Sequence, residues 1–272
     1  MVGSTTKMAP GGKGTQSLVI ENSGKAAAKK VRLTYVTPVY VNVNEKADLP
    51  RGCRMKLADA DPYLPQVVSC TLPRLAAGAK KKVTFPVTMT KRARFVGPNF
   101  GMGMARPVGT SDADPTDNWT QPIIQSIRPT PAVPQGHVVD LWHSIDVPPL
   151  SPQRGRDITF TFGNKGPDMN GPAQLVFVTP FYVNTDHKQP LPPGCSRKLA
   201  ETDPLLPEVV QCNLRPIPAG AERQLRIPLT LIPGGPRGVV YSLAVIAPDN
   251  VNDVERDQTD NLSGPGALNI QG

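Results

Sequence analysis

The chain has 272 residues, of which 32 are proline and 24 are glycine, while aromatic residues make up only 5%. At about 150 residues per domain this length predicts two domains, and the Pro and Gly content excludes a protein built mainly from long helices. The formal net charge of +8 is uneven, because residues 1–125 carry 18 Lys and Arg against 8 Asp and Glu, whereas residues 126–272 carry 12 against 14. This split favours a basic half that docks on an acidic surface and a near-neutral half that projects from it.

No stretch of the sequence approaches the ~20 apolar residues that a membrane span needs. The first residues also lack the apolar core of a secretory signal. We therefore expect no membrane span, and a surface location that is reached either after removal of a signal or by assembly onto a particle.

An internal repeat organises the chain. A shift of 142 residues aligns residues 22–90 with residues 164–232 without a gap, and 30 of the 69 aligned positions are identical. Such self-similarity indicates a duplication, so both copies must share one fold. We place the first domain at residues 1–128 and the second at residues 129–272.

The predicted elements are strands separated by turns. In each copy the strand before the Asn-x-Gly turn alternates apolar and polar residues and ends at that turn. The next strand is rich in β-branched and aromatic residues, with a proline that should interrupt the strand or place it at an edge. Short strands around the cysteines and further alternating segments complete each copy. In chain order the segments are 17–24, 31–43, 67–72, 81–89 and 100–105, and in the second copy 157–166, 174–185, 209–214, 223–231 and 241–247. About seven short strands per copy predict two tandem immunoglobulin-like β-sandwich domains, with a barrel as the alternative.

The first domain apparently lacks its first strand. Residues 137–145 would form that strand in the second copy, and the matching positions of the first copy fall before Met1. An uncovered sheet edge invites pairing with another strand, so we expect either a longer natural chain or strand donation between subunits. A first domain whose own residues cover that edge would contradict strand donation.

The four cysteines have the same spacing in both copies, 17 residues from Cys53 to Cys70 and from Cys195 to Cys212. We predict one disulfide within each copy, worth roughly 3 kcal/mol by the loop-entropy estimate; the alternative is a set of reduced, buried thiols. The spacing does not match a Cys-x-x-Cys metal site. Disulfides would indicate an oxidising setting, on a released particle or outside a cell.

The sequence offers no recognisable catalytic set, and we expect a protein that is not an enzyme and needs no cofactor. None of His137, His143 and His187 recurs in the other copy, and the first two are interpreted as surface or edge residues. No glycine-rich phosphate loop or hydrolase motif is present. The only metal candidates are the acidic loops that end each copy, as weak calcium ligands, against which stands an interpretation as Asx turns: Asp112, Asp114, Asp117, Asp253, Glu255, Asp257 and Asp260.

The basic residues of the first copy form three runs, and their partners in the second copy are mostly not basic. They are either solvated strand ends or a footprint for an acidic lattice or polymer. Nucleic acid is not the expected partner, because no aromatic stacking face accompanies the charges. The candidate partner-binding residues are Lys29, Lys30, Lys80, Lys81, Lys82, Lys91, Arg92 and Arg94.

Several repeated motifs carry a family resemblance: an Asn-x-Gly turn, Leu-Pro-x-Gly-Cys, a second Cys followed closely by Leu, Ala-Gly-Ala, and a late acidic loop ending in Thr-Asp-Asn. Together they resemble the CARDB-like and related immunoglobulin-like modules of bacterial surface proteins, which also occur on phage virions. The resemblance implies an adhesive or spacer role and brings no catalytic residues. We expect a virion decoration protein that attaches through its basic domain. The alternatives are a secreted surface module that binds a wall polymer or host ligand, and an accessory domain of an enzyme.

Overall fold

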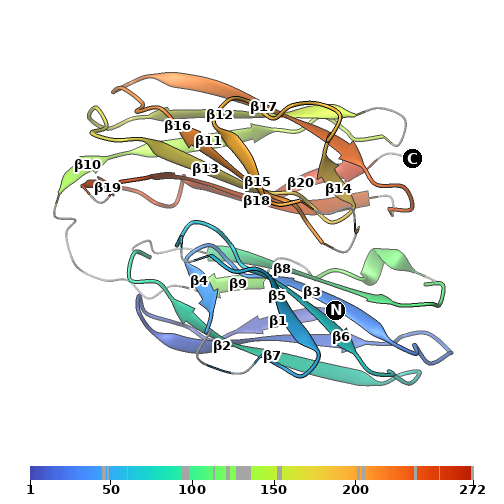
Figure 1. The fold of residues 1–272 in the computed structure, drawn as a ribbon. Helices are drawn as coiled ribbons and strands as arrows, with labels where there is room; N and C mark the ends of the chain where they lie inside the picture. Colours follow the sequence, from blue (N-terminus) through green and yellow to red (C-terminus); the bar gives the residue numbers. More distant parts are fainter. Residues whose placement is uncertain are drawn as a thin grey trace. The chain divides into compact units, whose positions relative to one another are not determined.

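The computed structural model describes residues 1–44, 47, 49–59, 61–93, 98–112, 114–120, 123–126, 136–151, 155–200, 203, 206–235, 238–250 and 252–270. The chain divides into two compact units, which Figure 1 colours from blue to green and from green to red. Unit 1 is Met1–Pro129 and unit 2 is Thr130–Gly272. Within the described residues the single helical element is a short 3₁₀ helix, Pro115–Asp117.

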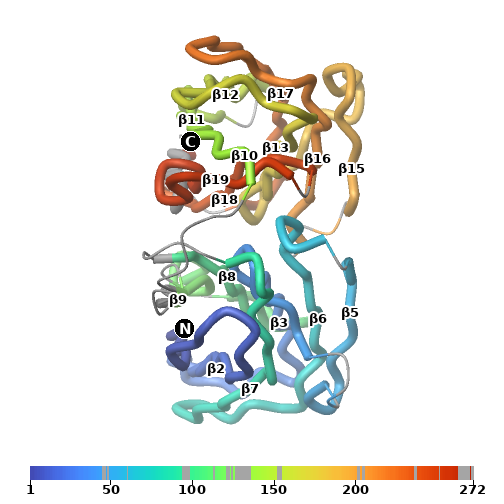
Figure 2. The backbone as a smooth tube through the Cα atoms, turned by 90° about the vertical axis from the view of Figure 1, so that its left-hand side faces the viewer, coloured from blue at the N-terminus to red at the C-terminus, as the bar shows by residue number. Residues whose placement is uncertain are grey.

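Unit 1 is a sandwich of two antiparallel sheets with the strand orders β1-β2-β7-β4 and β5-β6-β3-β8-β9 (Figure 2). This arrangement confirms the immunoglobulin-like sandwich and excludes the barrel, because the strands form two separate sheets. Nine strands are described, two more than expected. Their bounds are β1 Val2–Thr5, β2 Lys13–Glu21, β3 Val31–Val36, β4 Val41–Val43, β5 Cys53–Leu57, β6 Val67–Leu72, β7 Lys80–Met89, β8 Pro98–Pro107 and β9 Ile123–Ser126.

Unit 2 repeats this topology with the sheets β11-β12-β17-β14 and β15-β16-β13-β18-β20, and adds a two-stranded parallel ribbon, β10-β19. The ribbon has no counterpart among the described strands of unit 1. The bounds are β10 His137–Val139, β11 Leu141–Asp146, β12 Arg156–Asn164, β13 Ala173–Val178, β14 Val183–Thr185, β15 Cys195–Leu199, β16 Val209–Leu214, β17 Glu222–Leu231, β18 Gly238–Pro248, β19 Asp253–Glu255 and β20 Leu262–Ile270.

The core of each unit lies between its two sheets. In unit 1 the rings of Tyr35 and Phe85 stack across the sandwich with their centroids 4.6 Å apart. In unit 2 Phe160 meets Phe177 edge-on at 5.2 Å, so the second ring comes from β12 instead of the strand equivalent to β7. All four side chains are fully buried, and burial of large aromatic side chains dominates the energetics of such cores.

The predicted interruption at the proline is where the chain changes sheets. β3 and β4 belong to different sheets, and the link between them places buried Tyr40 at φ 63°, while Tyr182 in unit 2 has φ 64°. Positive φ is unusual for a bulky residue. It is held here by backbone hydrogen bonds, because the carbonyl of Tyr40 accepts from the Thr90 N–H at 2.8 Å and that of Tyr182 accepts from Ile232 at 2.8 Å.

The expectation that domain 1 lacks its first strand is wrong. β1 pairs with β2 in the register Val2↔Val19, and β11 pairs with β12 in the register Ser144↔Thr161. The two registers differ by the repeat offset of 142, so the chain's own first residues cover the edge opposite residues 16–19. The sequence comparison missed this strand because β1 and β11 overlap over only part of their lengths. Strand donation along that edge therefore loses its premise.

Both predicted disulfides are present. Cys53 bonds to Cys70 and Cys195 to Cys212, and all four cysteines are used. In each unit the two cysteines face each other on neighbouring antiparallel strands, in the registers Cys53↔Cys70 and Cys195↔Cys212. The bonds indicate an oxidising environment outside the reducing cytosol.

Candidate functional site

A groove of about 740 Å³ at one end of unit 1 is lined by cations. At this end of unit 1, β6 ends and β7 begins. All four charged residues that line the groove are basic and exposed, and its floor includes the buried side chains of Leu72 and Val83. Among the described residues none of these cations forms an ion pair. The four are Lys30, Arg51, Lys81 and Lys82.

A tight turn before the disulfide builds one wall of this groove. The Cys53 N–H donates to the Pro50 carbonyl at 2.9 Å, and the Thr71 N–H donates to the Gly52 carbonyl at 2.8 Å. Gly52 has φ +84°, and a Cβ there would lie 2.5 Å from the Thr71 carbonyl oxygen, so only glycine fits. The turn holds Arg51 at the rim. Sequence analysis missed Arg51, although the contrast between Leu-Pro-Arg-Gly-Cys and Leu-Pro-Pro-Gly-Cys marks it.

Unit 2 keeps the turn but not the charges. Gly194 has the same φ of +84°, and its carbonyl accepts from the Asn213 N–H at 2.9 Å. The one cation at an equivalent position, Arg223, donates to the backbone carbonyls of Arg215 and Pro216 at 3.2 and 3.1 Å. The repeat equates the four groove cations of unit 1 with Pro172, Pro193, Arg223 and Gln224.

The structure does not gather all the predicted basic residues into one surface. Lys91 and Arg92 follow the end of β7, whereas Lys81 lies at its start; at about 3.3 Å per residue the two ends are about 30 Å apart. Lys80 pairs with Glu21 at 3.1 Å, and Lys29 lies outside the groove lining. The prediction for Arg94 falls outside the described residues. The single footprint is therefore corrected to a smaller cluster.

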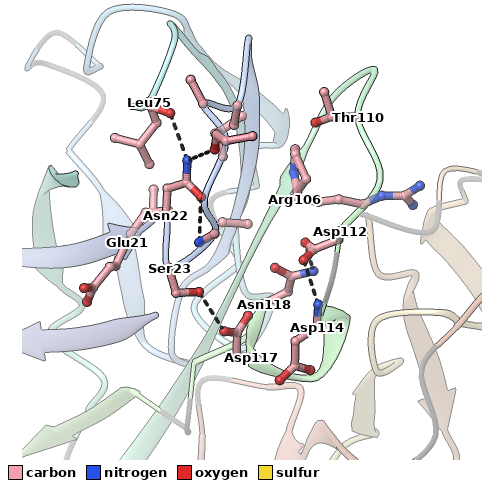
Figure 3. Close-up of a pocket in the computed structure, with 18 of the residues that line it drawn as sticks. Glu21, Asn22, Ser23, Leu75, Arg106, Thr110, Asp112, Asp114, Asp117 and Asn118 are labelled. Atoms are coloured by element: carbon pink, nitrogen blue, oxygen red, sulfur yellow. Dashed lines mark hydrogen bonds between the residues drawn. The ribbon is translucent and has the colours of Figure 1, made fainter. Parts of the chain in front are cut away.

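A second pocket of unit 1, of about 320 Å³, lies between the turn after β2 and the acidic loop after β8 (Figure 3). Asn22 anchors the turn, since its side-chain amide donates to the carbonyls of Ala26, Leu75 and Ala76 at 2.9, 3.1 and 3.1 Å. The Ser23 hydroxyl reaches across to Asp117 at 3.5 Å. Carboxylates on both walls and an apolar floor thus line one space: Glu21, Asp112, Asp114 and Asp117 over Ile20, Val31, Leu75 and Ala105.

The carboxylates of the loop in unit 1 bind the loop itself. Asp112 accepts from the Asp114 N–H at 3.2 Å and from the Asn118 amide at 2.9 Å. Asp114 accepts from the Thr116 hydroxyl and from the Thr116 N–H, the latter at 3.0 Å, and these hydrogen bonds lower the pKa of Asp114. Burial and the neighbouring acids raise the pKa of Asp117. These contacts confirm the Asx-turn interpretation.

The loop in unit 2 is more buried and more firmly tied. Asp253 accepts from the N–H groups of Asn170 and Gly171 at 3.0 and 3.1 Å, and Asp260 pairs with Lys165 at 2.7 Å. Asp257 accepts from the Thr259 hydroxyl and from the Thr259 N–H, the latter at 2.8 Å, and these hydrogen bonds lower the pKa of Asp257.

Glu255 in this loop is buried, and burial raises its pKa to about 8. Its Oε1 accepts from the N–H groups of Leu141 and Arg256, both at 3.1 Å. Across the described parts of both units, no three His, Cys, Asp or Glu side chains come together as a metal site requires. Neither acidic loop therefore supplies a calcium site from described side chains alone.

The histidines occupy different environments. His143 is buried beside Phe160, contrary to the expectation of a surface residue, and burial lowers its pKa to about 4. His137 lies 3.5 Å from Asp253. His187 contacts the buried carboxylate of Glu208, which also accepts from the Thr185 N–H at 2.7 Å.

The contacts of Glu208 are structural. At the equivalent position of unit 1, the Gln66 side chain accepts from the Val43 N–H at 2.7 Å. In each unit this side chain joins the segment just before β6 or β16 to β4 or β14, the strand that follows the change of sheets. His187 therefore contacts a carboxylate, Glu208, that already has a structural role.

No described segment is a helix long and apolar enough to span a membrane. No family model matches the chain, and no curated protein matches it.

Solved structures give only distant likenesses. The chain is similar to red sea bream transglutaminase, with 10% identity and a TM-score of 0.26, covering 99% of this chain and 31% of that one. It is similar to the C-terminal domain of the Streptococcus pyogenes antigen I/II-family protein AspA, with 9% identity and a TM-score of 0.27 over 92% of each chain. It is also similar to E. coli alpha-2-macroglobulin, with 15% identity and a TM-score of 0.26, covering 98% of this chain and 16% of that one. Two of these structures are thus much longer than this chain, and all three likenesses are too weak to support an argument about function.

Proposed function

We propose that this protein is a non-enzymatic structural protein of an extracellular surface, and that unit 1 attaches it to an anionic partner through the cationic groove. The observation that carries the proposal is the groove itself, where four exposed cations surround an apolar floor and no described lining residue is a carboxylate. Converging cations over a concave surface focus a positive potential on it and attract negatively charged partners.

The contrast between the units supports attachment by one end. The turns, strands and disulfides recur in unit 2, whereas three of the four cations do not, and the fourth is matched by Arg223, which bonds to backbone carbonyls. A charge that the scaffold does not need for folding is free to serve binding. The partner we favour is the acidic exterior of a virus capsid, with this protein as its decoration. The module resemblance stated above also supports attachment to an anionic wall polymer.

The test measures binding to two immobilised anionic polymers, polyglutamate as a carboxylate surface and a polyglycerol phosphate as a wall polymer. The full chain should bind, and salt should weaken the complex because screening acts on exposed charges. Replacing Lys30, Arg51, Lys81 and Lys82 by Gln should weaken binding at least about tenfold, equivalent to about 1.4 kcal/mol.

The matched control is the double variant Lys91→Gln/Arg92→Gln, which removes positive charge at the opposite end of β7. It should change the affinity by less than about twofold, since those residues lie roughly a strand length away. Equal loss in both variants, or attachment that salt does not weaken, would contradict the groove as the docking site. Preference for polyglutamate supports a protein lattice, and preference for the phosphate polymer supports a wall.

A further inference from the structure

The acidic pocket of unit 1 has an instructive counterpart in unit 2. There, residues 137–141 run as an extended segment along the turn after β12. The Lys165 N–H donates to the Asp140 carbonyl at 2.7 Å, and the Asp140 N–H donates to the Asn164 side chain at 3.3 Å. On its other side the segment pairs with the acidic loop in the register Val139↔Glu255. A turn and an acidic loop thus hold one extended strand between them.

The same turn and loop line the pocket of unit 1. Asn22 and Gly24 are equivalent to Asn164 and Gly166, and the Asn22 Oδ1 accepts from the Gly24 N–H at 3.1 Å as Asn164 does from Gly166 at 2.9 Å. Among the described residues of unit 1, no strand takes the place that residues 137–141 have in unit 2. Figure 3 shows the two walls facing each other across this space.

The position of Met1 fixes where an extended segment would run. Its amino group donates to the Asp117 carbonyl at 3.3 Å, just as the His143 N–H donates to the Asp260 carbonyl at 3.2 Å. A smaller space of about 110 Å³ borders Met1, and the residues it shares with the pocket include Glu21, Ser23 and Asp117. The groove therefore continues the line of β1 past Met1, between the turn and the loop.

The floor of the groove selects apolar side chains at alternate positions. In unit 2 the segment buries Val139 and Leu141 completely. In unit 1 the floor is apolar, and Ala27 stands where unit 2 has the buried side chain of Met169. The smaller alanine leaves room that methionine occupies in unit 2.

The charges of the two units differ at the residue between those apolar positions. In unit 2 Asp140 lies 3.5 Å from Arg256 and near Lys165. In unit 1 the position of Lys165 is taken by Ser23 and that of Gly163 by Glu21. Carboxylates outnumber cations among the described lining residues, because Asp112, Asp114 and Asp117 stand against Lys25 and Arg106, while the fourth acid, Glu21, pairs with Lys80 outside the lining. A cation would fit where unit 2 carries an aspartate.

We propose that the acidic pocket of unit 1 binds an extended peptide segment of another polypeptide, with apolar residues at alternate positions and a basic residue between them. The backbone of the segment would bond to the Asn22–Gly24 turn, as β-strand addition does elsewhere. This site shares no lining residue with the cationic groove. Its failure would leave the proposed function untouched, and the reverse also holds.

The experiment titrates two capped synthetic peptides onto the full chain by isothermal calorimetry. One has the sequence of residues 137–142, and the other carries Asp140→Lys. The lysine peptide should bind several-fold tighter than the aspartate peptide, and hydrogen exchange should show new protection in residues 20–28 and 105–112. Binding of neither peptide, equal binding of both, or protection confined to unit 2 would overturn the proposal.

The variant Gly24→Ala tests the geometry. A Cβ on Gly166 would lie 2.7 Å from the Asp140 backbone nitrogen, whereas a Cβ on Gly24 meets only Asn22 Oδ1, at 3.2 Å. The substitution should therefore abolish peptide binding and leave Tm nearly unchanged. Lys91→Ala is the control that should bind normally. Wild-type affinity in Gly24→Ala would overturn the proposal.

Discussion

The two units share one scaffold and differ most at the end where the turn after the first long strand meets the acidic loop. In unit 2 that end is closed by the β10-β19 ribbon, and Val139 and Leu141 are fully buried there. In unit 1 the equivalent turn and loop line a pocket, with the cationic groove at the same end. The contrast teaches that the duplicated copies kept the residues that set the backbone and diverged in the exposed residues that line the pocket and the groove.

The largest expected effect tests whether the scaffolds are equivalent. Replacing Cys53 and Cys70 by Ala should lower the unfolding free energy of unit 1 by about 3 kcal/mol, because a loop of about this size is released in the unfolded chain. The Cys195/Cys212 double variant should cost unit 2 the same. Hydrogen exchange with mass spectrometry during denaturation reports each unit separately. A loss that differs between the units by more than about twofold would show that the repeat is not energetically symmetric.

The next effect separates the units by pH. Glu255 has a folded pKa of about 8 against 4.5 for the free side chain, so the folded state holds its proton longer and the stability of unit 2 falls as pH rises through that window. His143 has a folded pKa of about 4 against 6.5, so the unfolded state takes up a proton first and stability falls as pH drops from 6.5 to 4. Unit 2 should therefore be most stable near pH 5–6.

Two variants check these opposite limbs. Glu255→Gln should remove the loss on the alkaline side and His143→Phe the loss on the acid side, each by roughly 3 to 5 kcal/mol over its full pH window, since one pKa unit corresponds to about 1.4 kcal/mol. Chemical denaturation at a series of pH values measures both. Unit 1 serves as the internal control, and an identical pH profile in both units would contradict the assignment.

A smaller effect compares the two anchoring asparagines. Asn164 donates to the carbonyls of Pro167 and Ile217 at 2.6 and 3.0 Å and is almost fully buried, whereas Asn22 is partly exposed. Asn164→Ala should cost about 2 kcal/mol and Asn22→Ala about 1 kcal/mol, because water can replace the lost partner only where it has access. Thermal melts of the two variants give the comparison, with Ser23→Ala as a neighbouring control. The reverse order would contradict the closed end of unit 2.

The smallest effect concerns the ion pair of unit 1. Lys80 and Glu21 are 3.1 Å apart, but their side chains are 63% and 48% exposed. Lys80→Ala should change the unfolding free energy by less than about 0.5 kcal/mol, because water screens such a pair. Unit 2 has Glu222 opposite Gly163 and folds the same way. A larger loss in a urea titration would assign this pair a structural role.

The repeat made much of the fold predictable. Spacing alone paired the cysteines, and the proline in Val-Thr-Pro predicted the interruption of the strand, because both features depend on local geometry; that the chain changes sheets there came from the structure. The first strand was missed, since four residues of weak pattern gain their structure only from pairing with β2. The burial of His143 was missed for a similar reason, because the alternation of β11 does not reveal which face meets the core.

The candidate site was less predictable than the fold. Clusters of basic residues are visible in a sequence, but whether they share a surface depends on which strand ends coincide. Lys30, Arg51 and Lys81 are far apart in the chain and line one groove. Lys81 and Lys91 are much closer in the chain, yet Lys81 lies at the start of β7 and Lys91 just beyond its end. Topology, rather than composition, decides which charges act together.

The position of the disulfides has a mechanical consequence for either unit under tension. Each bond closes a loop within one sheet, between Cys53 and Cys70 or between Cys195 and Cys212, and leaves the first and last strands of its unit outside that loop. Tension on the ends would be resisted by backbone hydrogen bonds and core packing, with no covalent bond across the sandwich. Under load most of the chain in each unit would unfold and extend. The residues between the two cysteines could not extend, because the disulfide closes them into a loop.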